Sequence, residues 1–272
     1  MTAGEQTGER LDYTAFSAAG WSITCLQDTP LITALKQGAW PPPGACLVHL
    51  KGDLKNSSGL VHQGGRTYFF KRFRQNACIA AAKRLFGVDR ARSNWLVARH
   101  LLNAGVPTPA PVALLLRGGE SWFISEAIPE SITLAKLARQ KGPMAAEHYA
   151  RGFVPAIARM HDSGTLHGDL KWGNLLVGRD DRLFIVDLDS ASVRRKAPAA
   201  RVARDLARFF VAGLEEGLSR RWAEETFEHY SRLSARCRPL PALSPDVSRH
   251  VDAISKLHHA RYGRPLVRLP RR

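Results

Sequence analysis

Four side chains whose types and order suit phosphoryl transfer stand within a short stretch of the sequence. Asp169 is followed by Lys171 and Asn174, and Asp187 comes thirteen positions later, at the end of an apolar run. Phosphoryl transfer leaves a protein little covalent chemistry to perform, so the protein must position groups and neutralise charge. We expect Asp169 to orient an acceptor hydroxyl and take its proton, with Lys171 beside the moving phosphoryl group. Asn174 and Asp187 offer the oxygen ligands that Mg²⁺ prefers.

Two short apolar runs on either side of a turn predict a β-hairpin that brings the two candidate metal ligands together. The runs are Leu175–Val177 and Leu183–Val186, and residues 178–181 between them read Gly-Arg-Asp-Asp. Short β-rich runs bounded by turn residues are typical of a hairpin. Because a hairpin returns the chain, Asp187 should leave one strand close to where Asn174 enters the other.

The length and composition of the chain are those of an ordinary globular protein. It has 272 residues, 44% of them hydrophobic and 24% charged, which allows one two-lobed domain or two small ones. No run of 18 apolar residues occurs, the first ten residues lack the features of a signal peptide, and the four cysteines are scattered without metal spacing. These features predict a protein without a membrane span that stays in the cytoplasm.

The formal net charge of +16 is the strongest compositional signal and predicts anionic partners. Residues 66–99 hold nine Lys or Arg and one acid, residues 194–208 hold six and one acid, and the last twelve residues hold five Arg and no acid. Such charge suits nucleic acid, a membrane surface or a phosphorylated substrate. No recognised nucleic-acid module accompanies it, so we expect no nucleic-acid partner.

Strand-like runs dominate the first half of the sequence and predict an antiparallel meander. The runs cover about residues 45–51, 59–63 and 67–73, and a hairpin is expected from 112–116 and 121–125. The third run contains Lys71, our candidate for holding the α- and β-phosphates of a nucleotide, since protein kinases carry such a lysine on their third strand. Arg72 should face the opposite side by strand alternation. We expect residues 1–20 to form a loose tail or an early cover of the sheet.

Helical periodicity replaces the strand pattern after residue 126. Helices are expected over residues 131–140, 145–164, 201–213, 219–235 and 244–258, with Ser131 as a cap of the first. The fold class is therefore α+β, with a β-rich, nucleotide-binding lobe over residues 1–126 and a mainly helical catalytic and substrate lobe over 127–272. Asp205 is either a buried acid that holds the catalytic-loop backbone or a member of a surface ion pair. His167 is expected to brace the loop rather than exchange protons.

The chain resembles the protein-kinase-like superfamily and, within it, the bacterial lipopolysaccharide core kinases of the Kdo/heptose kinase family. The matching stretches read YFFKRF, NWLVARHLLNAGVPTP, HGDLKWGNLL, IVDLD and RDLA, in family order, from Tyr68 to about Phe210. The resemblance implies a two-lobed fold, ATP and Mg²⁺ as cofactors, and phosphorylation of a Kdo or heptose hydroxyl of the inner core. It also implies work at the cytoplasmic face of the inner membrane, in peripheral contact with its anionic surface. An anionic lipid A-core substrate would explain the basic charge. An acidic protein could also shield the basic faces, and we expect a monomer.

One position departs from the kinase pattern and keeps other hypotheses open. Asn94 stands on the predicted helix 89–104 where a kinase has the Glu that pairs with the strand lysine. An amide can hydrogen-bond Lys71 but cannot neutralise it. The alternatives are an atypical protein kinase, a small-molecule phosphotransferase, and a pseudokinase that binds nucleotide without turnover. The segment after Asp187 lacks Ala-Pro-Glu and is short for a peptide-docking platform, which argues against a protein substrate.

Overall fold

The structure is a computed structural model that describes residues 11–27, 29–37, 40–42, 45–52, 56–80, 89–234 and 243–269. The chain divides into two compact units. The first comprises Met1–Arg99 and Pro109–Ala127, and the second comprises His100–Thr108 and Ile128–Arg272. None of the described helices is long and apolar enough to cross a membrane.

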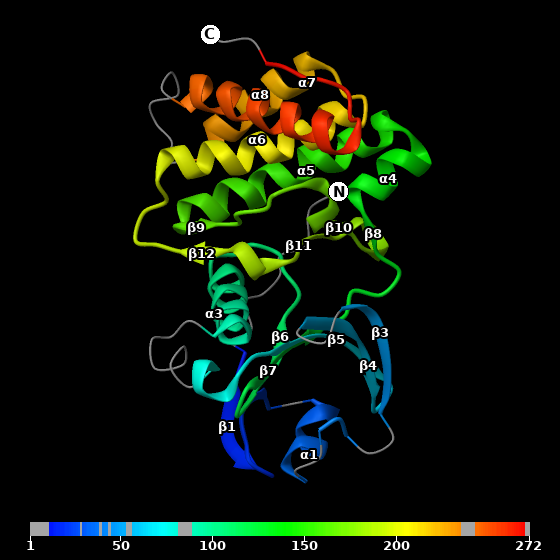
Figure 1. Cartoon of the computed structure of the whole chain (residues 1–272). Helices are drawn as coiled ribbons and strands as arrows, with labels where there is room; N and C mark the ends of the chain where they lie inside the picture. Colours follow the sequence, from blue (N-terminus) through cyan, green and yellow to red (C-terminus); the bar gives the residue numbers. More distant parts are fainter. Residues whose placement is uncertain are drawn as a thin grey trace. The chain divides into compact units, whose positions relative to one another are not determined.

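The described residues of the first unit build a seven-stranded antiparallel sheet (Figure 1). Its strands follow the order β1-β2-β6-β7-β5-β4-β3. This arrangement confirms the predicted meander of β3 to β5 and the predicted hairpin of β6 and β7. The bounds are β1 Tyr13–Ala18, β2 Trp21–Leu26, β3 Cys46–Gly52, β4 Asn56–Gln63, β5 Arg66–Arg74, β6 Pro111–Arg117 and β7 Glu120–Glu126.

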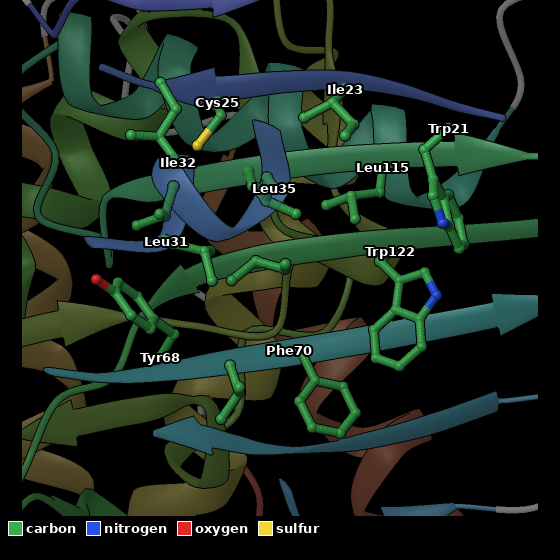
Figure 2. Close-up of a cluster of buried hydrophobic side chains, with 14 residues drawn as sticks. Trp21, Ile23, Cys25, Leu31, Ile32, Leu35, Tyr68, Phe70, Leu115 and Trp122 are labelled. Carbon is green, nitrogen blue, oxygen red and sulfur yellow. The ribbon is translucent and has the colours of Figure 1, made fainter. Parts of the chain in front are cut away.

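A short helix, α1 (Pro30–Lys36), packs on one face of this sheet and closes the core of the unit. Its buried side chains Leu31, Ile32 and Leu35 lie among inward-facing side chains of the strands (Figure 2). The strand side chains labelled there are Trp21, Ile23, Cys25, Tyr68, Phe70, Leu115 and Trp122. The sheet is thereby fixed as a rigid support for the residues on its other face.

The predicted loose tail over residues 1–20 is wrong for the part that forms β1. Strand β1 pairs with β2 in register from Tyr13↔Leu26 to Ala18↔Trp21. The run YTAFSA carries few large apolar side chains, which is why the sequence pattern hides it. Two other contacts fix the edge: the Tyr13 hydroxyl donates to the carbonyl of Pro111, and the Tyr13 ring packs edge-on against Trp95.

Helix α3 (Arg90–Asn103) matches the predicted helix 89–104. Asp89 begins it: its buried carboxylate accepts a hydrogen bond from the backbone N–H of Arg92, three residues on, in the manner of a helix cap. An earlier helix was expected over residues 77–86. Residues 77–80 are helical, whereas 81–88 lie outside the described residues.

The second unit is mainly helical, as predicted (Figure 1). Helix α6 runs beside both α5 and α8. The expected cap of α4 is wrong by two residues, because the Thr133 side chain accepts from the N–H of Lys136, whereas Ser131 donates to a carbonyl in the preceding turn. The helix bounds are α4 Leu134–Lys141, α5 Pro143–Asp162, α6 Ala199–Glu215, α7 Arg220–Leu233 and α8 Leu243–Tyr262.

Short strands and 3-10 turns lie between α5 and α6, in the stretch that holds the candidate catalytic residues. Strand β10 is paired on both sides, antiparallel to β11 and to β8, and β9 pairs antiparallel with β12. Strand β8, Ile132–Thr133, directly precedes α4. The other bounds are β9 Thr165–Leu166, β10 Leu175–Val177, β11 Leu183–Ile185 and β12 Ser192–Val193, with 3-10 turns η1 Trp172–Asn174, η2 Arg179–Asp181 and η3 Leu188–Ser190.

Candidate active site

The predicted hairpin is present and brings Asn174 and Asp187 to the same end of the ladder. Strand β10 pairs with β11 from Leu175↔Ile185 to Val177↔Leu183. The ladder continues by one bond, in which the N–H of Val186 donates to the carbonyl of Asn174 at 3.0 Å. Asp187 follows immediately in a left-handed conformation, with φ 64° and ψ 64°. The chain therefore turns sharply at this aspartate, which is a sparsely populated conformation for a residue with a side chain.

The carboxylate of Asp169 is held through one of its two oxygens. Oδ2 accepts from the ammonium of Lys171 at 2.7 Å and from the amide Nδ2 of Asn174 at 3.1 Å. The same Nδ2 donates to the backbone carbonyl of Asp169 at 2.8 Å. Among the described residues, Oδ1 accepts no hydrogen bond. Asp169 is therefore fixed in orientation, while its Oδ1 stays open to accept a hydrogen bond from a ligand.

His167 braces this loop in the way the sequence predicted. Its Nε2 lies 3.0 Å from the carbonyl of Val186, and its Nδ1 lies 3.3 Å from the backbone N–H of Asp169. The ring is buried, and burial lowers its pKa, although nearby carboxylates oppose the shift. A neutral imidazole with its proton on Nε2 satisfies both contacts. His167 thus ties the loop of Asp169 to the strand that ends at Asp187.

Asp205, on α6, anchors the same loop through its backbone. Its position decides between the two roles predicted for it, a buried acid or a member of a surface ion pair. Its buried carboxylate accepts from the backbone N–H groups of His167 at 2.7 Å and Gly168 at 3.0 Å. Burial raises the pKa of this carboxyl, but the nearby His161, the His167 ring and the hydrogen bond from the backbone N–H of His167 outweigh burial and leave the pKa lowered. Asp205 is a buried acid that holds the loop backbone, not part of a surface pair.

Gly168 is required by the shape of the loop. Its φ is +80°, a left-handed conformation, and an added Cβ would stand 2.5 Å from the backbone carbonyl oxygen of Ser190. Only glycine avoids both the strain and the clash. The loop can therefore run close to the turn η3 that follows Asp187.

An aromatic cluster fixes the next turn of the loop. Trp172, the first residue of η1, is fully buried, with ring centroids 6.3 Å from Phe209 of α6 and 5.9 Å from Trp222 of α7. Because Trp172 lies between Lys171 and Asn174, its burial restrains both ends of the candidate catalytic sequence. No role was predicted for this tryptophan from the sequence.

Arg208 stands next to the candidate catalytic aspartate and was not among the site residues predicted from the sequence. Its Nε lies 3.9 Å from Oδ1 of Asp169, and its Nη1 lies 3.9 Å from Oδ1 of Asp205. Arg208 follows Asp205 by three residues, so both side chains project from one side of α6. That spacing in the stretch RDLAR was the available signal.

Lys71, the candidate nucleotide ligand, lies in the first unit on β5. Tyr68 and Phe70 of this strand face the α1 side of the sheet, and the Arg72 guanidinium stacks over Trp122 at 5.2 Å from the ring centroid. Alternation therefore puts half-buried Lys71 on the opposite face, and the prediction for Arg72 is confirmed. The nucleotide-binding role of Lys71 stays a prediction.

Asn94 uses its amide within its own helix. Its Nδ2 donates to the carbonyl of Arg90, one turn earlier in α3, at 2.9 Å, and the side chain is buried. A glutamate at this position could not donate to a carbonyl in the same way. The substitution of Asn for the kinase glutamate therefore fits the local packing of α3.

The donor set fits a magnesium ion. Because both protons of Asn174 Nδ2 point to Asp169, the planar amide directs its Oδ1 away from that carboxylate. Asp187, the second candidate oxygen ligand, is exposed and follows Val186 at the same end of the hairpin as Asn174. Among the described residues, no group of three or more His, Cys, Asp or Glu could hold a metal alone. Mg²⁺ is commonly bound by one or two protein oxygens together with nucleotide phosphates and waters.

The antiparallel sheet, the helical unit and the anchored loop define a protein of the protein-kinase-like class. The family model described as "Lipopolysaccharide kinase (Kdo/WaaP) family" matches residues 52–230, and the chain belongs to this family. This confirms the resemblance noted from the motifs.

Curated relatives agree with this placement, and a solved structure shares the fold. The lipopolysaccharide core heptose(I) kinase WaaP of Pseudomonas aeruginosa is 32% identical over 180 residues, 58% of this chain and 66% of the relative. The 3-deoxy-D-manno-octulosonic acid kinase of Vibrio parahaemolyticus is 30% identical over 133 residues, 47% of this chain and 54% of the relative. The matched region thus spans about half to two thirds of these relatives. A structure of WaaP in complex with acyl carrier protein has a TM-score of 0.61 at 23% identity, over 80% of this chain and 90% of that chain.

Proposed function

We propose that this chain is a kinase that transfers the γ-phosphoryl group of ATP to a sugar hydroxyl of the lipopolysaccharide inner core. The observation that carries the proposal is the carboxylate of Asp169, which is held through Oδ2 near the two candidate Mg²⁺ ligands and keeps Oδ1 open. Family membership and the kinase relatives support it.

Each candidate residue then has a defined task. Asp169 Oδ1 accepts the proton of the acceptor hydroxyl as its oxygen forms a bond to phosphorus and the bond to the leaving ADP breaks. Lys171 stabilises the charge on the transferred group. Lys71 holds the α- and β-phosphates. Asn174 and Asp187 hold Mg²⁺, which when bound neutralises phosphate charge.

The acceptor is Kdo or heptose, the two sugars named by the relatives. The net charge of +16 suits an anionic lipid A-core substrate at a membrane surface rich in anionic groups. We therefore place the protein in peripheral contact with the cytoplasmic face of the inner membrane. An acidic protein partner also fits this charge, and the structural relative was solved with acyl carrier protein.

The test is transfer of radiolabelled phosphate from MgATP to purified, dephosphorylated lipopolysaccharide core, offered separately as Kdo-terminated and heptose-terminated acceptors. Asp169→Ala should lower kcat by about 10²- to 10⁴-fold, the usual contribution of a general base. Asp180→Asn is the matched control, because Asp180 is exposed in the hairpin turn with φ 58°, a conformation that Asn tolerates. Unchanged transfer by Asp169→Ala would contradict the mechanism.

A pseudokinase is the alternative that one residue favours. Asn94 cannot neutralise a lysine, and its amide is engaged with the carbonyl of Arg90. Retained ATP binding, with no transfer from the unmodified protein to either acceptor, would support this alternative.

A further inference from the structure

The guanidinium group of Arg208 has hydrogen-bonding capacity that the described part of the chain does not use. Arginine carries five N–H donors. The two nearest carboxylate oxygens, on Asp169 and Asp205, are each 3.9 Å away, beyond hydrogen-bond range. Nη1 is buried and has no hydrogen-bond partner among the described residues. The Arg208 side chain nevertheless keeps 28% of its surface exposed, so its remaining N–H donors can reach an acceptor group from outside the chain.

The position of Arg208 indicates which ligand would supply that group. Asp169 Oδ2 faces Lys171 and Asn174, so the nucleotide and metal belong on that side in the proposed mechanism. Oδ1 is the open oxygen, and it is the one next to Nε of Arg208. A hydroxyl that donates to Oδ1 therefore places its neighbouring substituents beside the guanidinium.

We propose that Arg208 binds an anionic substituent, a carboxylate or a phosphate, carried by the acceptor sugar next to the hydroxyl that is phosphorylated. The planar guanidinium is suited to bidentate recognition of either group, which a lysine could match only as a point charge. Asp205 lies on the Nη1 side, 3.9 Å away, which leaves the Nε side of the guanidinium toward Asp169. This proposal rests on the proposed function, because it takes Asp169 as the residue that receives the acceptor hydroxyl.

Steady-state kinetics with a Kdo-terminated lipid A acceptor test the role of Arg208. Arg208→Gln should raise the acceptor KM about 10- to 100-fold, as expected for loss of hydrogen bonds to a charged group, and leave the KM for ATP unchanged. Arg208→Lys keeps the charge and should recover part of the loss. Arg204→Gln, which removes an exposed arginine one turn earlier in α6, is the control for net charge and should leave both KM values unchanged.

Changing the acceptor identifies the anion and does not depend on the folding of any variant. The three acceptors are the intact molecule, its carboxylate methyl ester, and the molecule after phosphatase treatment. The modification that removes the partner of Arg208 should raise the KM of the unmodified protein and have little effect on Arg208→Gln. An unmodified protein that treats all three acceptors alike, or an Arg208→Gln variant with the original acceptor KM, overturns the inference.

Equilibrium binding separates this inference from the proposed function. The acceptor Kd is measured by calorimetry with the unmodified chain, with Asp169→Ala, and with Arg208→Gln. If no phosphate is transferred but Arg208→Gln weakens binding of the anionic acceptor 10- to 100-fold, the kinase proposal fails and the anion site stands. If transfer occurs and the Kd values with and without Arg208 are equal, the anion site fails alone.

Discussion

The carboxylate of Asp205 holds the backbone of the candidate catalytic loop by hydrogen bonds, so its replacement should affect both stability and turnover. In Asp205→Asn, the amide keeps one acceptor oxygen, but its Nδ2 faces an N–H donor of either His167 or Gly168. We expect the free energy of unfolding to fall by about 3 kcal/mol, the scale for breaking a buried charged network. Urea unfolding measures it, with the exposed Asp180→Asn as control. A loss below about 0.5 kcal/mol would contradict the anchoring role.

A second single residue, His167, should make the stability of the protein depend on pH. Its pKa is lowered by burial in the folded chain, whereas the unfolded chain has an ordinary value of about 6.5. Below that pH the unfolded chain takes up a proton more readily, so the free energy of unfolding falls as the pH drops, by at most about 1.4 kcal/mol per pH unit for this residue. The lowered pKa of Asp205 acts in a different window, below about pH 4.

Urea unfolding at pH 7.5, 6.5 and 5.5 checks this expectation. His167→Gln should be less stable at pH 7.5 but should lose less stability between pH 6.5 and 5.5 than the unmodified chain. The other nine histidines remain in the variant and serve as the internal control. Identical slopes for the two proteins would show that His167 does not titrate in the way its burial implies.

Single residues were predictable from the sequence where their spacing repeats a known chemistry. Asp169, Lys171 and Asn174 are close in sequence, so local structure alone brings them together. Arg208 was not predictable in this way, because its place beside Asp169 depends on how α6 packs against the loop. A contact between residues 39 positions apart has no signal in the local pattern.

At the scale of elements, strong apolar periodicity predicted the strands β3 to β7 and the helices of the second unit. It failed where an element draws its stability from neighbours. Strand β1 has few large apolar residues of its own and is held by its pairing with β2. Helix α1 has only seven residues and was also missed. Its sequence did carry a usable signal, namely Pro30 at its start and the four apolar residues that the structure buries.

The packing of α6 against the loop yields a prediction about Gly213. A Cβ added there would stand 2.6 Å from the ring of Trp222 and 2.7 Å from that of Trp172. Overpacking costs about 1–3 kcal/mol and should outweigh the roughly 1 kcal/mol that Ala gains over Gly in a helix. We therefore expect Gly213→Ala to lower the free energy of unfolding and, because Trp172 must shift, to lower kcat as well.

Gly152→Ala in α5 is the matched control for that substitution. Its Cβ would meet only the end of the Leu183 side chain, at 3.0 Å, and such a side chain can move. Thermal unfolding of both variants, with turnover on the same acceptor, makes the comparison. Equal stabilities would show that the aromatic cluster is looser than its ring contacts imply.

At the scale of the whole molecule, the charge of +16 should make recognition of an anionic acceptor dependent on salt. One basic run of the second unit lies close to the candidate loop: it follows β12, which pairs with β9, the strand directly before His167. Arg194, Arg195 and Lys196 are all exposed there. This run is therefore placed to attract an acceptor toward the loop, whereas other exposed cations add mainly to the general field.

Replacing all three with Gln should lower kcat/KM for the anionic acceptor by about tenfold or more at 50 mM salt, at up to roughly 1 kcal/mol per charge near an anionic surface. The variant should also have a flatter dependence on salt between 50 and 300 mM, because it has less attraction to screen. The control removes the same charge from the exposed Arg232, Lys256 and Arg261 of α7 and α8. Equal losses in both triple variants would assign the effect to net charge alone. Salt-independent kcat/KM in the unmodified chain would mean that its charge serves another partner, such as an acidic protein.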